Sequence, residues 1–142
     1  MKYKLISIDL AKNVFQIALL DQKNTLVSNK KVSRNKLLHT LRQFSPTLVV
    51  MEACYSSNHW GRAIAKMGHT VKLIPARLVK AFLIGNKNDA NDALAIAEAA
   101  QRPKIHFVGV KTIEQIFLQI LIHIVICSRK LKREVLISLR NF

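Results

Sequence analysis

Cysteine, glycine and acidic residues are scarce in this 142-residue chain, and each scarcity argues against a class of protein. The two cysteines, Cys54 and Cys127, have no paired spacing, which argues against a disulfide framework and for a reducing compartment. The four glycines lie far apart, so the sequence has no glycine-rich phosphate-binding loop. The five histidines show no zinc-ligand spacing with one another or with the cysteines.

Long apolar runs are also absent. The longest, residues 116–127, contains Gln119 and His123 and is well short of the roughly 20 residues that a membrane-spanning helix needs. Near the N-terminus, Asp9 interrupts the apolar stretch that a signal peptide would require. We therefore expect neither a signal peptide nor a membrane anchor.

Charge of one sign dominates the chain. It has 23 Lys and Arg against 8 Asp and Glu, a formal net charge of +15. The basic residues are spread along the chain, and half of all residues are apolar, which predicts a folded body with a basic face. Such a face attracts nucleic acid or, less specifically, an anionic membrane surface.

The pattern of apolar residues predicts an α/β fold with a mixed sheet, flanking helices and a C-terminal helical segment. Strands are expected at residues 4–10, 14–20, 25–32, 47–52 and 71–74, and helices at 37–44, 57–67, 78–85 and from residue 88. Residues 105–110 are predicted to form a short strand, and residue 112 begins a long helix. That helix is unusual, because half of residues 116–127 are β-branched.

Four of the eight acids fall at positions where they could converge. Asp9 and Glu52 end two predicted strands, and Asp89 and Asp92 lie three apart at the start of a helix. If the two strands are neighbours, Asp9 and Glu52 project near one end of the sheet, and the helical pair shares a face that could point there. Converging carboxylates form a hard-oxygen site for Mg²⁺ or Mn²⁺, and two such ions serve phosphodiester cleavage.

Ordinary explanations exist for each acid, as a strand-end residue, an ion-pair partner or a complement to a helix N-terminus. On that interpretation the chain is a non-catalytic nucleic-acid-binding or assembly module, with residues 116–127 as an oligomerisation surface. A third alternative is a stand-alone resolvase-type nuclease.

Several segments carry a family resemblance: residues 6–12 (ISIDLAK), 49–53 (VVMEA), 73–75 (LIP), 79–80 (VK) and 86–93 (NKNDANDA). In order and spacing they resemble the DEDD transposases of the insertion-sequence one-ten family, over roughly residues 3–115. The resemblance implies an RNase H-like fold of the RuvC type in residues 1–110, followed in residues 111–142 by the start of a helical, coiled-coil-like region. It implies that Asp9, Glu52, Asp89 and Asp92 are the catalytic and metal-binding residues, with Mg²⁺ or Mn²⁺ as the cofactor, in two copies.

The same resemblance implies DNA and a structured bridge RNA as partners, a homo-oligomer in the intact enzyme, and a cytoplasmic, nucleoid-associated location in a prokaryotic cell. The basic residues expected to contact nucleic acid are Lys12, Lys80, Lys87, Arg129, Lys130, Lys132 and Arg133.

Two departures from the family pattern carry expectations of their own. Family recombination also needs a C-terminal domain with a serine nucleophile, and this chain stops at Phe142, so we expect it to be truncated and inactive alone. Tyr55 stands where the family usually has a small glycine after the strand-end glutamate, and a bulky side chain there is expected to crowd the site.

Overall fold

The computed structural model describes residues 3–82 and 89–140, and within α4 and α5 it leaves the side chains of Asp89 and of residues 134–140 undescribed. The chain divides into two compact units, which we call unit 1 (Met1–Val110) and unit 2 (Lys111–Phe142). Each unit is considered by itself below.

Unit 1 is built on a five-stranded sheet in the order β3-β2-β1-β4-β5. The strands are β1 (Leu5–Asp9), β2 (Val14–Leu20), β3 (Leu26–Ser33), β4 (Leu48–Ala53) and β5 (Thr70–Pro75). Strand β2 runs antiparallel to β1 and β3, whereas β1, β4 and β5 run parallel to one another. This mixed sheet with flanking helices confirms the predicted α/β, RNase H-like fold, and all five strands lie where the apolar pattern predicts them.

The turn between β2 and β3 is closed by local hydrogen bonds. One carboxylate oxygen of Asp21 accepts from the backbone N–H groups of Lys23 and Thr25, each at 2.8 Å. Asn24 adopts a φ of 66°, a left-handed conformation that asparagine tolerates better than most residues. The turn therefore fixes the register of the hairpin in which Gln16 of β2 lies opposite Lys31 of β3.

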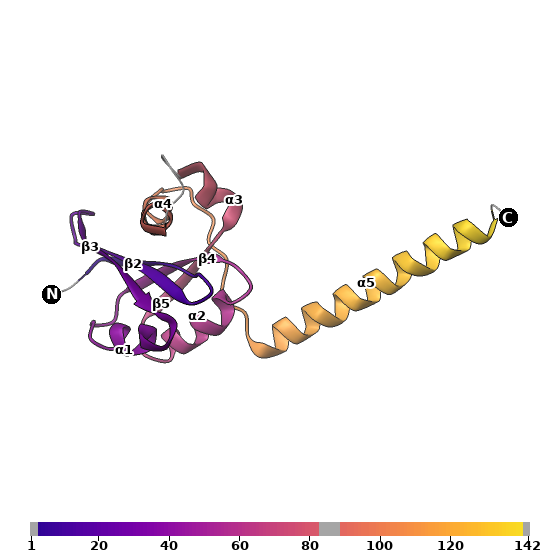
Figure 1. Cartoon of the computed structure of the whole chain (residues 1–142), viewed down its shortest axis with the longest axis horizontal. Coiled ribbons are helices and arrows are strands. Elements are labelled where there is room, and N and C mark those ends of the chain that lie inside the picture. The colour runs from indigo at the N-terminus through magenta and orange to yellow at the C-terminus, as the bar shows by residue number, and fades with distance from the viewer. Residues whose placement is uncertain (1–2, 83–88, 141–142) are drawn as a thin grey trace. The chain divides into compact units, whose positions relative to one another are not determined.

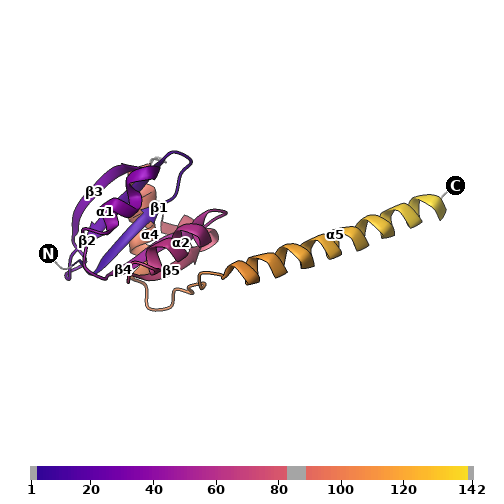
Figure 2. The same ribbon diagram turned by 90° about the horizontal axis from the view of Figure 1, so that it is seen from below.

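Helices cover both faces of the sheet (Figures 1 and 2). They are α1 (Leu37–Leu41), α2 (Ser57–Ala65), α3 (Ala76–Val79) and α4 (Asp89–Ala100), with 3₁₀ turns η1 (Arg34–Lys36) and η2 (Lys80–Phe82). Helices α1 and α2 lie on one face, and α3 and α4 lie on the other (Figure 1). The predicted helix over residues 78–85 is seen as α3 and η2 up to Phe82, and its last residues lie outside the described part of the chain.

Each face of the sheet has its own apolar core. Phe15, Trp60 and Ile64 belong to the cluster that α1 and α2 close, whereas Val50 and Ile96 belong to the cluster under α4. Helix α4 buries small residues against the sheet, namely Ala93, Ala95, Ala97 and Ala99. Their small side chains let the backbone of α4 come close enough to the sheet for direct polar contacts with strand side chains.

The strand predicted at residues 105–110 is wrong. Only Val108 pairs with the sheet, in an isolated bridge to Leu73 whose two backbone hydrogen bonds measure 3.2 and 2.9 Å. Ile105 and Phe107 instead pack on the core cluster under α4, and Val110 packs on the opposite cluster. The segment therefore crosses the edge of the sheet rather than extending it.

Unit 2 consists of one 28-residue helix, α5 (Ile113–Arg140), despite its many β-branched residues. Its exposed large apolar side chains are Ile113, Phe117, Leu118, Ile120, Leu121, Ile122, Ile124, Val125, Ile126 and Leu131. Among the described residues, none of the helices combines the length and apolar character needed to span a membrane.

Candidate metal centre

Asp9 and Glu52 stand side by side at the carboxyl ends of neighbouring strands. Strands β1 and β4 pair in parallel, with Ile8 opposite Met51, and the next residue on each strand is an acid. Asp9 is the last residue of β1, and both acids are half-buried. The sequence analysis made the convergence of these two acids conditional on their strands being neighbours, and the sheet meets that condition.

Both acids lie on the face of the sheet that α4 covers. Ser7, two residues before Asp9, is fully buried, and its hydroxyl donates a 2.7 Å hydrogen bond to the backbone carbonyl of Ala93 in α4. Val50, two residues before Glu52, belongs to the core cluster under α4. Because side chains alternate along a strand, Asp9 and Glu52 follow Ser7 and Val50 onto the same face.

The third described carboxylate comes from the first turns of α4. Asp92 directly precedes Ala93, the residue that the Ser7 hydroxyl contacts. Its Oδ1 atom is buried, and no described residue gives it a hydrogen-bond partner. A buried carboxylate oxygen without a partner is costly unless a cation satisfies it, so Asp92 suits a cation-binding role.

The fourth predicted carboxylate, Asp89, is the first residue of α4, and its side chain lies outside the described part of the structure. Among the side chains that are described, no three His, Cys, Asp or Glu residues form a group that could hold a metal ion. Carboxylate oxygens are the donors that Mg²⁺ and Mn²⁺ prefer, and the unpaired Oδ1 of Asp92 fits the same chemistry. A centre made of Asp9, Glu52, Asp89 and Asp92, called the carboxylate centre below, stays a prediction.

Tyr55 does not crowd this edge of the sheet as expected. Its side chain is fully solvent-exposed, at 105% relative accessibility, in the turn that follows β4. A fully exposed ring occupies no space beside Glu52, so the departure from the family pattern leaves the site open.

Polar residues that the sequence analysis missed lie on the same face. Gln16 of β2 is 4% exposed and is the sheet partner of Asp9, and Asn29 of β3 contacts both Gln16 and the backbone of α4. The available signal was Gln16 itself, the one polar residue in the otherwise apolar strand Val14–Leu20. The other residues on its face of the strand are apolar, so alternation did not mark Gln16 as a site residue, and α4 packs over it.

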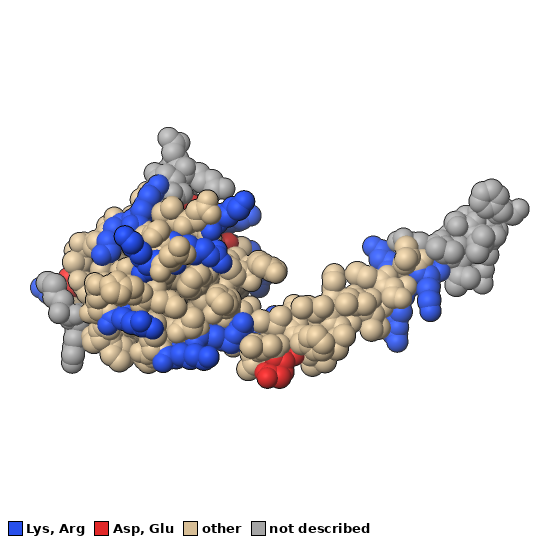
Figure 3. All heavy atoms as spheres, turned by 60° about the horizontal axis from the view of Figure 1, so that its bottom comes forward, with Lys and Arg blue, Asp and Glu red and all other residues tan. Residues whose placement is uncertain are grey.

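The basic residues predicted to contact nucleic acid are exposed wherever the structure describes them. Lys12 and Lys80 lie on unit 1, and Arg129, Lys130, Lys132 and Arg133 lie on α5 of unit 2. Lys87 lies outside the described residues. Figure 3 shows Lys and Arg side chains scattered over much of the visible face of unit 1, with few acidic side chains among them.

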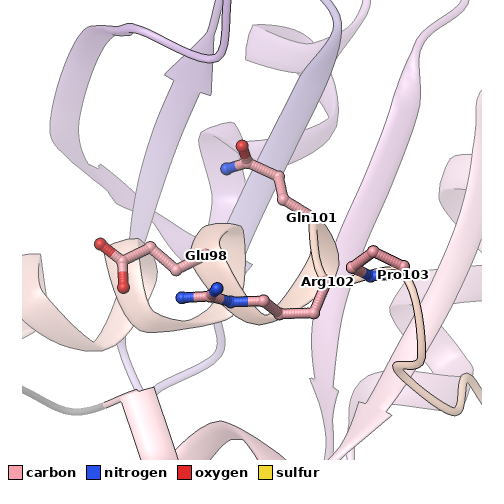
Figure 4. Close-up of a pocket in the computed structure, with 4 residues that line it drawn as sticks. All are labelled: Glu98, Gln101, Arg102 and Pro103. Atoms are coloured by element: carbon pink, nitrogen blue, oxygen red, sulfur yellow. The ribbon is translucent and has the colours of Figure 1, made fainter.

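A hollow of about 560 Å³ lies at the far end of α4 from Asp92 (Figure 4). It is lined by Glu98, Gln101, Arg102 and Pro103, and the Arg102 guanidinium stacks 5.3 Å from the ring centre of Phe82. Glu98 follows Asp92 by six residues, roughly 9 Å along a helix, so this hollow is separate from the carboxylate centre.

Comparison with known proteins decides the family. The family model for DEDD transposases of the IS110 type, described as a transposase, matches residues 6–124 of this chain. The chain belongs to the IS110 family of DEDD transposases.

Curated relatives of this IS110-family chain are transposases by name. It is 44% identical over 115 residues to a probable family 20 transposase of Pseudomonas aeruginosa, covering 81% of this chain and 34% of that protein. It is 41% identical over 121 residues to the transposase for insertion sequence element IS1111A of Coxiella burnetii, covering 85% and 33%. It is 41% identical over 111 residues to the transposase for IS1328 of Yersinia enterocolitica, covering 78% and 33%. The chain spans about a third of the length of these relatives.

Among solved structures, an exopolyphosphatase from Cytophaga hutchinsonii is similar with a TM-score of 0.37 and 13% identity. The match covers 55% of this chain and 36% of that one. A similarity of this size carries no argument about function.

Proposed function

We propose that unit 1 is the metal-binding catalytic domain of an insertion-sequence transposase, and that it takes part in cutting and rejoining DNA. The observation that carries this proposal is the parallel register that brings Asp9, at the end of β1, beside Glu52, one residue before the end of β4, under the helix whose first four residues include two more acids. Membership of a DEDD transposase family supports the same assignment.

In this proposal the sheet and α4 supply ligands from opposite sides. Asp9 and Glu52 hold the cations from the strand ends, and Asp92 and Asp89 hold them from the start of the helix. Oδ1 of Asp92, which has no hydrogen-bond partner among the described residues, would be satisfied by this coordination. Two Mg²⁺ or Mn²⁺ ions at such a centre activate the attacking oxygen and stabilise the leaving oxygen of a phosphodiester.

The basic residues near this edge bind the DNA backbone. Lys12 lies in the loop after β1, and Lys80 lies in η2, which follows β5 and α3. Because β1 and β5 are parallel, their carboxyl ends lie at the same end of the sheet as Asp9 and Glu52. Lys12 follows the end of β1 in the sequence, and Lys80 follows the end of β5. They are placed to contact phosphates on either side of the one that reacts, and the bridge RNA binds to other parts of the same basic surface.

The experiment is DNA affinity with and without Mg²⁺, measured at constant ionic strength by fluorescence anisotropy on the full chain. Cations in the carboxylate centre cancel its repulsion of phosphate, so wild-type affinity rises when Mg²⁺ is added. Asp92→Asn loses most of that gain. Glu98→Gln, which removes a charge of the same sign from the exposed far end of the same helix, keeps it.

An equal gain in all three proteins would mean that Mg²⁺ acts on the DNA or on the general surface charge. The absence of a gain in the wild type would leave the acids without a role in DNA binding. Either result would contradict the proposed metal-dependent function.

A second function, assembly through unit 2, is favoured by the exposed apolar surface of α5. Ile113, Phe117, Ile120, Ile124, Cys127 and Leu131 follow one another at alternating intervals of four and three residues. That spacing is the seam of a coiled coil, in which each helix buries its apolar stripe against a partner. We propose that α5 joins copies of the chain into a homo-oligomer.

A further inference from the structure

Gln16 is a buried polar residue next to the carboxylate centre and outside the predicted set of acids. It is 4% exposed and lies opposite Asp9 in the antiparallel pairing of β2 with β1. Residues opposite each other on antiparallel strands direct their side chains to the same face, with Cβ atoms about 4.5–5.5 Å apart. The Cβ atom of Gln16 therefore lies beside the Cβ atom of Asp9.

Two hydrogen bonds connect Gln16 to the beginning of α4. Its Nε2 donates to Oδ1 of Asn29 at 2.6 Å, and Nδ2 of Asn29 donates to the backbone carbonyl of Ala90 at 3.0 Å. Ala90 lies between Asp89 and Asp92 in the sequence. This relay joins the strand beside Asp9 to the helical turn that carries the other acids.

These two hydrogen bonds also determine which atom of the Gln16 amide takes no part in them. The carbonyl of Ala90 can only accept, so Asn29 must present its nitrogen there and its oxygen to Gln16. Gln16 must then present its own nitrogen to Asn29. The remaining atom, Oε1 of Gln16, is buried and has no hydrogen-bond partner in the part of the chain that the structure describes.

The interface between the sheet and α4 therefore contains two buried oxygens for which the described residues supply no hydrogen-bond partner. Oε1 of Gln16 comes from the sheet, and Oδ1 of Asp92 comes from α4. A bare protein interior leaves both oxygens unsatisfied, at a cost in stability. A divalent cation that retains some of its water supplies positive charge for the carboxylate and O–H donors for the amide oxygen.

We propose that Gln16 is a positioning residue of the carboxylate centre, whose Oε1 accepts a hydrogen bond from water on the bound divalent cation. The inference rests on the proposed function. Its Nε2 holds the first turn of α4 through Asn29, and its oxygen orients the hydrated cation. Outer groups of this kind raise metal affinity about 10- to 100-fold in other metal sites.

The test uses Mn²⁺ alone, titrated calorimetrically into the full chain and its variants. Gln16→Met removes both amide atoms with little change in length, whereas Asn29→Leu breaks the relay and leaves the Gln16 oxygen in place. We expect Gln16→Met to lower Mn²⁺ affinity about 10- to 100-fold. Asn29→Leu lowers it by a smaller factor, and Gln16→Glu, which keeps an oxygen, retains affinity at or above the wild-type level.

Thermal unfolding without metal separates this role from a structural one. Gln16→Met removes an unpaired buried oxygen but also the hydrogen bond to Asn29, so its midpoint falls no further than that of Asn29→Leu. Asn29→Leu leaves the carbonyl of Ala90 without its side-chain donor, so its midpoint falls. A larger loss of Mn²⁺ affinity in Gln16→Met than in Asn29→Leu, at a midpoint that is no lower, is the result that a purely structural residue would not give.

Unchanged Mn²⁺ affinity in Gln16→Met, with binding abolished in Glu52→Gln, overturns the inference and leaves the proposed function standing. Equal losses of affinity in Gln16→Met and Asn29→Leu, with lower midpoints in both, also overturn the inference. Loss of Mn²⁺ binding in Gln16→Glu overturns it too. No Mn²⁺ binding by the wild type overturns both the inference and the proposed function.

Discussion

The hydroxyl of Ser7 donates a 2.7 Å hydrogen bond to the backbone carbonyl of Ala93, and both residues are fully buried. Ser7 lies two residues before Asp9, and Ala93 lies one residue after Asp92. This contact fixes α4 on the strand that ends in Asp9. It therefore helps to set where Asp92 lies along β1 relative to Asp9.

Replacing Ser7 with alanine removes this contact. We expect Ser7→Ala to lower the free energy of unfolding by about 0.5–1.5 kcal/mol, the usual net contribution of a protein hydrogen bond. Urea denaturation measures it. Ser33→Ala is the matched control, because Ser33 is exposed and makes no side-chain capping hydrogen bond to the turn that follows it. An equal effect of both substitutions would show that the Ser7 contact does not stabilise the fold.

Helix α2 packs closely against the segment that leads out of unit 1. A methyl group added at Gly61 would lie 2.7 Å from Cγ2 of Val110, which is closer than carbon atoms approach. We expect Gly61→Ala to destabilise unit 1 by about 1–3 kcal/mol through overpacking, partly offset by about 1 kcal/mol of better helix propensity. Chemical denaturation of the single variant measures the net effect.

The physical cause is tested by the same substitution in a Val110→Ala background. Removing the two methyl groups leaves room for the new Cβ, so Gly61→Ala becomes neutral or stabilising there. The same loss of stability in both backgrounds would assign the effect to the α2 backbone instead.

The basic edge of the sheet predicts how DNA binding depends on salt. A contact with duplex DNA contributes about −0.9 to the slope of log affinity against log salt concentration. We expect Lys12→Ala and Lys80→Ala each to reduce the slope by about that amount. Lys23→Ala is the control, because Lys23 lies in the turn after β2, at the opposite edge of the sheet. Equal changes in slope for all three lysines would contradict a binding face at the carboxylate edge.

The seam on α5 predicts self-association of the chain. Ile120→Glu and Ile124→Glu place charges at seam positions and should lower the mass measured by light scattering or sedimentation. Ile122→Glu is the matched control, because it makes the same substitution at a position off the seam. Ile122 is 52% exposed and Ile120 is 51% exposed. A mass that falls equally in all three variants would indicate non-specific apolar association rather than a coiled coil.

Four of the five strands of unit 1 could be predicted because they are apolar runs, whereas β3, with the sequence LVSNKKVS, was predicted from the turn that precedes it. That β1 and β4 are neighbours could not be read from the sequence, because strand pairing depends on contacts between distant segments. The strand predicted at residues 105–110 failed because only Val108 of that segment pairs with the sheet, in an isolated bridge to Leu73.

The polar part of the site was missed for a related reason. Gln16 shares its face of β2 with Val14, Ala18 and Leu20, so alternation did not distinguish it from a core position. Its burial follows from the alanines of α4, which let that helix lie close over the sheet. The acids were predictable because carboxylates are scarce in a basic chain, whereas a neutral amide has no such signal.

The central claim is that Asp9, Glu52, Asp89 and Asp92 form one divalent-metal centre, and calorimetric titration of Mn²⁺ tests it most directly. The wild type should bind Mn²⁺, the double variant Asp9→Asn with Asp89→Asn should not, and Glu98→Gln should bind as the wild type does. Undiminished binding in the double variant would place the metal elsewhere, and equal loss in Glu98→Gln would reduce the effect to net charge. Either result would contradict the account.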